Sequence, residues 1–150
     1  MSVDPSALLA PGSIRLFEQA ATKEHAVRMC GEALVDAGAV EPAYIDSMLE
    51  REASISTFLG EGVSIPHGTN AGKTSVLRDA LCVLRFPDGV DWGAGTATLC
   101  IGIAAQGDGH LEILAELAQI LLDPSRADAL RKAEDPQTVL TLLTPTEGES

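Results

Sequence analysis

The residues best suited to carry out chemistry surround His67. Val63 and Ile65 are typical of a strand, and Pro66 ends it. Gly68, directly after His67, can adopt backbone angles that a Cβ would forbid. The pattern predicts an exposed histidine held by rigid neighbours at the end of a strand, where a neutral imidazole nitrogen can act as a nucleophile. The alternative is that His67 is an ordinary turn residue.

Arg51 precedes His67 and lies at the end of an expected helix. A guanidinium group can donate two parallel hydrogen bonds to the oxygens of an anion, so Arg51 is a candidate for the same site. The alternative is a surface ion pair with Asp46, Glu50 or Glu52.

His110 and Thr69 are further candidates. His110 opens an expected helix, where backbone N–H groups attract an anion, although it could equally be a capping residue. Thr69 could orient an anion or the imidazole ring, but a turn hydroxyl that bonds its own backbone is the alternative. His25 has no comparable neighbours and is expected on a solvated face.

The first third of the chain contains the signals of a strand and two helices. Residues 1–13 are expected to form a tail and a turn, followed by a short strand at Ile14–Phe17. Thr22 is a plausible N-cap for a helix that ends at Gly38. Pro42 suits the first turn of a second helix. Its expected buried stripe is Ile45, Met48 and Leu49, and its polar side includes Glu50, Arg51 and Glu52.

The second half alternates strands and helices. Strands are expected at Ala80–Phe86 and 97–104, with turns at Pro87–Gly89 and 93–95. The strand at 97–104 is apolar on both faces, as a central strand covered on both sides should be. A short helix is possible at 69–77, and the last two helices carry N-cap carboxylates before a proline at Asp123 and Asp135. The remaining helix repeats apolar residues at Leu111, Leu114, Leu117, Ala118 and Leu121. This arrangement predicts a single layered α/β domain.

Composition narrows the function. The 150 residues are 45% hydrophobic and carry a net charge of −12, which argues against nucleic acid and anionic membranes as partners and suits basic protein surfaces. Cys30, Cys82 and Cys100 have no metal-binding spacing and are expected to be buried and reduced. No apolar run is long enough to span a bilayer, and no signal peptide is present, so a cytoplasmic protein is expected.

Several motifs in order resemble the enzyme IIA proteins of the mannitol/fructose class in the sugar phosphotransferase system, including their nitrogen-regulatory relatives. The segment Glu41–Glu52 is similar to the helix before the active site. Val63–Thr69 resembles the segment with the phosphorylated histidine, and residues 99–105 followed by 110–117 resemble the strand and helix with a second active-site histidine. The resemblance extends from about Ile14 to about Leu143 and is strongest to the mannitol branch.

The resemblance implies a mixed, mostly parallel five-stranded sheet flanked by helices on both faces, with 1–150 as one domain. It also implies that His67 accepts a phosphoryl group from the phosphocarrier HPr and donates it to a cysteine of enzyme IIB, without cofactor or metal. Transition-state charge on the phosphoryl oxygens would then be stabilised by Arg51, by His110 and by the backbone amides around Gly68 and Thr69. Which imidazole nitrogen is phosphorylated stays open.

Other functions lack their motifs. His67 and His110 have no HxH or HExxH partner for a metallohydrolase, there is no GxSxG elbow, and no glycine-rich loop for a nucleotide is present. The main alternative is a nitrogen-type regulatory enzyme IIA, which acts by phosphorylation-dependent binding to other proteins.

Overall fold

The described residues form a five-stranded mixed sheet with the strand order β1-β4-β5-β3-β2. The computed structural model describes residues 5–69, 71–106 and 109–144, with only the backbone of residues 109 and 110. The pairs β1–β4 and β3–β5 are parallel, whereas β4–β5 and β2–β3 are antiparallel. The strands are β1 Leu9–Arg15, β2 Phe58–Gly60, β3 Val63–Ser64, β4 Ala80–Asp91 and β5 Thr96–Ala104.

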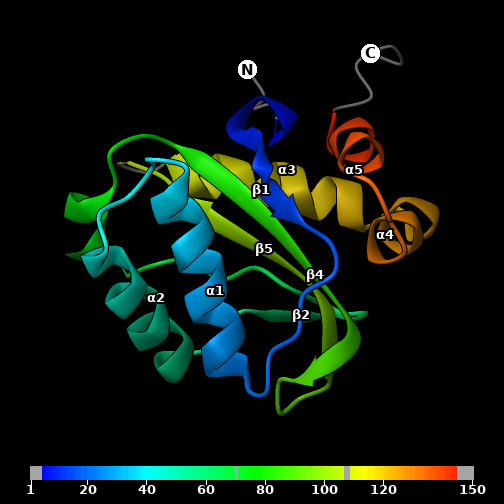
Figure 1. Ribbon diagram of the computed structural model, residues 1–150, viewed down its shortest axis with the longest axis horizontal. Coiled ribbons are helices and arrows are strands. Elements are labelled where there is room, and N and C mark those ends of the chain that lie inside the picture. Colours follow the sequence, from blue (N-terminus) through cyan, green and yellow to red (C-terminus); the bar gives the residue numbers. More distant parts are fainter. Residues whose placement is uncertain (1–4, 70, 107–108, 145–150) are drawn as a thin grey trace.

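Helices cover both faces of this sheet (Figure 1). On one side lie α1 and α2, and on the other side lie α3, α4 and α5. The α-helices are α1 Lys23–Asp36, α2 Ala43–Ser54, α3 Gly109–Leu121, α4 Pro124–Arg131 and α5 Pro136–Leu143, and two short 3₁₀ helices are η1 Pro5–Leu8 and η2 Ala71–Ser75. The expected layered α/β domain, with a mixed sheet between helices, is confirmed.

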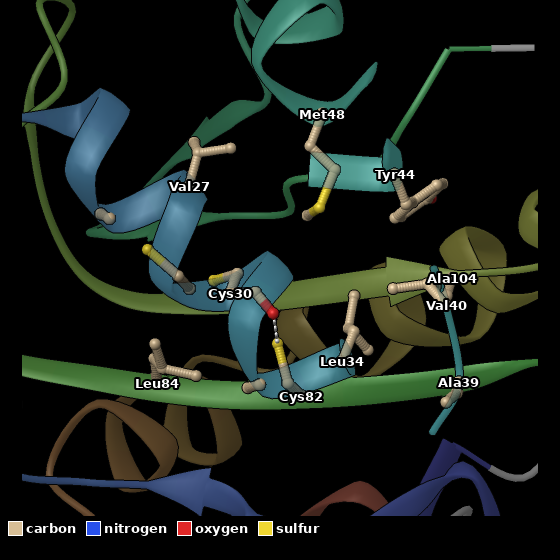
Figure 2. Close-up of a cluster of buried hydrophobic side chains, with 14 of the residues drawn as sticks. Val27, Cys30, Leu34, Ala39, Val40, Tyr44, Met48, Cys82, Leu84 and Ala104 are labelled. Atoms are coloured by element: carbon tan, nitrogen blue, oxygen red, sulfur yellow. Dashed lines mark hydrogen bonds between the residues drawn. The ribbon is translucent and has the colours of Figure 1, made fainter. Parts of the chain in front are cut away.

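Side chains of the two central strands alternate between two hydrophobic clusters, as the period of a strand requires. On β5, Cys100 and Ala104 face α1 and α2, while Ile101 and Ile103 face α3–α5. Figure 2 shows part of the first cluster, where the thiol of Cys82 on β4 donates to the backbone carbonyl of Cys30 on α1 at 3.4 Å. All three cysteines are buried and unbridged, as expected.

The helix ends follow the expected capping. The hydroxyl of Thr22 accepts the N–H of His25 at 3.1 Å, and Gly38 after α1 has a φ of +74°. Asp123 and Asp135 each cap a helix that begins with a proline. The side chain of His25 is exposed, as expected.

The prediction of a tail and a turn over residues 1–13 is wrong for the described residues 5–13, which form η1 and most of β1. Leu9 pairs with Leu81 of the neighbouring strand, and this tertiary pairing outweighs the local signal of Pro11. A proline without an N–H is tolerated there because β1 is an edge strand.

The turn predicted at Pro87–Gly89 is also wrong, because β4 continues through it to Asp91. The β4–β5 register shifts between Arg85 and Val90, and Gly89 has a φ of +81°, so the chain bends without reversing. The reversal comes later, where the amide of Trp92 donates to the carbonyl of Gly95 at 2.8 Å. The second expected turn, at 93–95, is therefore the one that forms.

The buried face of α3 differs from the expected stripe. Leu117 is buried, and Leu114 and Leu121 of the expected repeat are partly buried against the same cluster. Leu111 and Ala118 are exposed, and Ile113 and Ile120 complete the core face in their place. No helix among the described residues is long and apolar enough to cross a membrane.

Candidate active site

His67 lies just beyond β3, where the chain still runs beside the central strand β5. Its backbone forms a parallel bridge with Ile103, and the amide of Ile103 donates to the carbonyl of Pro66 at 2.9 Å. The expected position at the end of a strand is confirmed, and the side chain is half-buried. The backbone of His67 is thus fixed by the most buried strand of the sheet.

The imidazole ring has a defined orientation. Its Nδ1 lies 2.9 Å from the backbone carbonyl oxygen of Ile65. A carbonyl oxygen only accepts hydrogen bonds, so Nδ1 carries the proton in the neutral ring and the lone pair is on Nε2. The contact therefore favours the neutral tautomer with the lone pair on Nε2.

Tyr44, on α2, holds the backbone on the other side of the histidine. Its hydroxyl donates to the carbonyl of Ile103 at 2.8 Å and accepts the N–H of Gly68 at 2.9 Å. Burial raises the pKa of Tyr44 to about 12, against the smaller opposing effect of the Gly68 hydrogen bond. The hydroxyl thus stays protonated and connects β5 to the residue after His67.

Gly68 allows this approach because it lacks a side chain. A Cβ at Gly68 would lie 2.4 Å from Oγ of Ser47 and 2.5 Å from Cε1 of Tyr44. The Gly68 N–H donates to Tyr44. Gly68 therefore contributes to the site the space that lets the chain pack closely against α2. Thr69 follows, and its hydroxyl accepts the N–H of Gly72 at 3.1 Å, which is the turn role considered as the alternative.

Arg51 reaches the same place from the end of α2. Together with His67, Gly68 and Thr69 it lines a surface cavity of about 500 Å³, which is also bordered by Glu50, Ser54, Leu111 and Leu114. Its guanidinium donates to the backbone carbonyl of Ile55. Within the described part of the chain Arg51 has no ion pair, so the alternative pairing with an acidic neighbour does not occur.

His110 is the second residue of α3, as the sequence predicted, but its side chain lies outside what the structure describes. The following turn of the same helix brings Leu111 and Leu114 to the cavity. The start of α3 therefore borders the site, and the role of His110 stays a prediction.

Two residues that shape the site were missed or misplaced. Tyr44 was not singled out, and Glu52 was expected on the polar side of α2, yet both are buried. Glu52 was assigned to the polar side because the buried face of the helix was expected to consist of Ile45, Met48 and Leu49. The spacing of Tyr44, Met48 and Glu52, four residues apart each time, is the signal that places all three on one helix face.

Two exposed apolar residues belong to the segments that carry the site. Leu111 lines the cavity and is 60% exposed, and Ile55, whose carbonyl accepts from Arg51, is 66% exposed. No group of three metal-binding side chains occurs among the described residues.

The site thus combines a half-buried histidine, whose Nδ1 contacts a carbonyl, with an arginine that lines the same cavity. Residues 7–145 match the family described as "Phosphoenolpyruvate-dependent sugar phosphotransferase system, EIIA 2". The chain belongs to this family.

Relatives in the family differ in length. The chain is 43% identical over 130 residues to the mannitol-specific phosphotransferase enzyme IIA component of Enterococcus faecalis, covering 81% of this chain and 90% of that protein. It is 40% identical over 145 residues to a multiphosphoryl transfer protein of Xanthomonas campestris, covering 96% of this chain and 17% of that protein. The chain thus spans less than a fifth of the longer relative.

Solved structures have the same fold. The crystal structure of IIA mannitol from Escherichia coli has a TM-score of 0.84 at 39% identity, covering 90% of this chain and 98% of that one. A complex of IIA mannitol with phosphorylated enzyme IIB mannitol from the same organism gives 0.84 at 37%, covering 91% and 98%. The nitrogen regulatory protein IIA-Ntr of Neisseria meningitidis gives 0.80 at 25%, covering 93% and 98%.

Proposed function

We propose that this chain, acting as one domain over 1–150, is a phosphoryl carrier that accepts a phosphoryl group from phospho-HPr on Nε2 of His67 and donates it to a cysteine of enzyme IIB. The observation that carries the proposal is the 2.9 Å contact of Nδ1 with the carbonyl of Ile65, beside a cavity that Arg51 also lines. It leaves the nucleophilic lone pair on the other nitrogen.

In the first step, Nε2 of His67 forms a bond to phosphorus while the nitrogen–phosphorus bond of the donor breaks and its imidazole departs with the electron pair. In the second step a cysteine thiolate of enzyme IIB attacks phosphorus, and the bond to Nε2 breaks. Charge on the three equatorial oxygens is stabilised by the guanidinium of Arg51, with support from His110 and the hydroxyl of Thr69. The proton stays on Nδ1 throughout, hydrogen-bonded to the carbonyl oxygen of Ile65.

Both partners must reach the same nitrogen, so HPr and enzyme IIB dock in turn on one surface. Ile55 and Leu111 supply exposed apolar contacts beside the cavity, and the net charge of −12 favours basic partner surfaces. Such an interface is small and transient. The complex of IIA mannitol with phosphorylated enzyme IIB supports enzyme IIB as one of these two partners.

We further propose that the protein acts in the cytoplasm in uptake of mannitol or a related polyol or fructose-type sugar. Identity of 43% and 39% to mannitol-type proteins, against 25% to the nitrogen regulatory protein, favours transport over the regulatory alternative. Transfer to a mannitol-type enzyme IIB, with no transfer to other enzyme IIB domains, would support this choice.

Incubation with enzyme I, HPr and phosphoenolpyruvate is expected to add one acid-labile phosphate per chain. His67→Ala should remove the label completely, whereas His110→Ala should still be labelled, more slowly in both transfer steps. Persistence of the label in His67→Ala, or phosphate mapped under alkaline conditions to residues 109–117 in place of 63–69, would overturn the assignment.

A further inference from the structure

Glu52 is a buried carboxylate whose role the proposed phosphoryl transfer does not by itself require. It is 4% exposed and lies on the last turns of α2, next to Arg51. A charged side chain is seldom buried without several hydrogen-bonding partners. Glu52 has them from three other parts of the chain.

Every polar group around this carboxyl donates to it. The backbone N–H of Thr57 lies 3.2 Å from both oxygens, and the Thr57 hydroxyl also donates to Oε1. The indole N–H of Trp92 donates to Oε2 at 3.0 Å, and the ammonium of Lys23 lies 3.8 Å from the same atom. A carboxylate only accepts hydrogen bonds, so the charged form of Glu52 fits this set of donors.

One chain of hydrogen bonds leads from Glu52 to the ring of His67. Glu52 holds Thr57, and the carbonyl of Thr57 accepts the N–H of Ile65 at 3.0 Å. The carbonyl of that same Ile65 faces Nδ1 of His67 at 2.9 Å. Ile65, whose carbonyl selects the histidine tautomer, is therefore held through its own N–H by a residue bound to Glu52.

A second, shorter connection leads to Arg51. The guanidinium donates to the carbonyl of Ile55, which lies two residues before Thr57 in the same segment. Displacement of this segment would move the acceptor of Arg51 together with the peptide that orients His67. Both groups expected to meet the phosphate thus depend on one short segment, residues 55–57.

We propose that Glu52 is a positioning residue for phosphoryl transfer, which fixes the tautomer of His67 and the direction of the Arg51 guanidinium through residues 55–57. This inference rests on the proposed function for its effect on rate, but its effect on the imidazole ring is independent of any partner. A purely structural Glu52 would alter stability and leave the ring unchanged.

The test measures two quantities in Glu52→Gln, in Thr57→Val and in the control Asp135→Ala. Ring ¹⁵N chemical shifts give the fraction of His67 in the Nδ1–H tautomer, and the chain has only three histidines, which simplifies assignment. Single-turnover labelling by phospho-HPr gives the rate. Asp135 caps α5 on the opposite face of the sheet, so its substitution loosens the fold without touching the site.

Glu52→Gln is expected to lower the fraction of the Nδ1–H tautomer and to slow labelling roughly tenfold or more at saturating donor. Thr57→Val, which keeps the carboxylate and the Thr57 amide, should change both quantities in the same direction and by less. It also covers the case in which Glu52→Gln does not fold. Asp135→Ala should change neither.

A wild-type tautomer fraction in Glu52→Gln, or in Thr57→Val if the former is unfolded, would overturn the inference whatever the rate. An equal change in Asp135→Ala would also overturn it, because general loosening would then explain the result. If the wild-type chain accepts no phosphate while the tautomer still depends on Glu52, the proposed function fails and the positioning inference stands.

Discussion

The two faces of the sheet are built from different kinds of residue. The cluster beneath α3–α5 consists of Leu, Ile, Val and Ala alone. The cluster beneath α1 and α2 contains all three cysteines together with Tyr44, Met48, Phe86 and Trp92. Three of the five buried polar or charged residues described are on α2 or within three residues of its end, namely Ser47, Glu52 and Thr57.

This difference separates stability from positioning. Aliphatic packing is favourable but non-directional, so it holds α3–α5 on the sheet without fixing any one atom closely. Hydrogen bonds have direction: that of Tyr44 ends on Gly68, next to His67, and those of Glu52 include Thr57, whose carbonyl accepts from Ile65. The histidine is thus oriented from the α1 and α2 face, while the other face mainly supplies apolar burial.

The largest expected effect on stability is in the aliphatic cluster. Leu130→Ala removes a fully buried side chain from α4 and should lower the free energy of unfolding by about 2–5 kcal/mol. Phosphoryl transfer by the folded fraction should be unchanged. Urea unfolding and single-turnover labelling measure the two quantities, and a slowed transfer in fully folded Leu130→Ala would contradict the separation of roles.

Arg51→Ala should slow phosphoryl transfer strongly and change the stability little. Loss of a charged donor to the transition state should slow transfer by roughly a hundredfold. Its half-buried side chain donates only to the Ile55 carbonyl, so the loss of stability should stay under about 1 kcal/mol. Arg51→Lys, which keeps the charge without the planar fork, should fall between the two rates. Transfer at the wild-type rate in Arg51→Ala would contradict the role of Arg51 as a donor to the transition state.

Tyr44→Phe should lower both the free energy of unfolding and the rate of phosphoryl transfer. Without the hydroxyl, the N–H of Gly68 and the carbonyl of Ile103 lose a partner, which should cost about 1–3 kcal/mol and slow transfer. The folded-state pKa of about 12 lies above the ordinary value of 10.0, so this contribution to stability is complete below pH 10 and is lost as the pH rises towards 12. Absorbance of tyrosinate reports this directly because the chain has a single tyrosine. Titration of the folded protein near pH 10 would contradict the buried hydroxyl.

The smallest effect is expected at the helix caps on the aliphatic face. Hydrogen bonds from Thr138 lower the pKa of Asp135 below 3.8, so its stabilising effect is present above that pH and is lost as the pH falls below it. Asp135→Asn keeps an acceptor but does not titrate. Its unfolding free energy should match the wild type at pH 7 and fall less between pH 4 and pH 2, which denaturant titrations at several pH values would detect.

Local signals in the sequence determined much of this protein. A hydroxyl before a helix, carboxylates before proline, and an apolar strand ending in Pro66-His67-Gly68 are short-range features whose physics does not depend on the rest of the chain. They located the helices and the short strand β3 with the histidine just beyond its end. The turn signals at Pro11 and at Pro87–Gly89 failed, because pairing of the flanking strand residues with distant residues kept the chain in the sheet.

Only the tertiary structure decided which side chains meet. The tautomer of His67 depends on the direction of one carbonyl, and that direction depends on Thr57, Glu52 and β5. Glu52 was expected at the surface because its charge is normally solvated. Its burial became favourable only when Thr57, Trp92 of the β4–β5 hairpin and the ammonium of Lys23 on α1 came together around it. Sequence could determine the residue types of the site, whereas their orientation required hydrogen bonds between segments far apart in the chain.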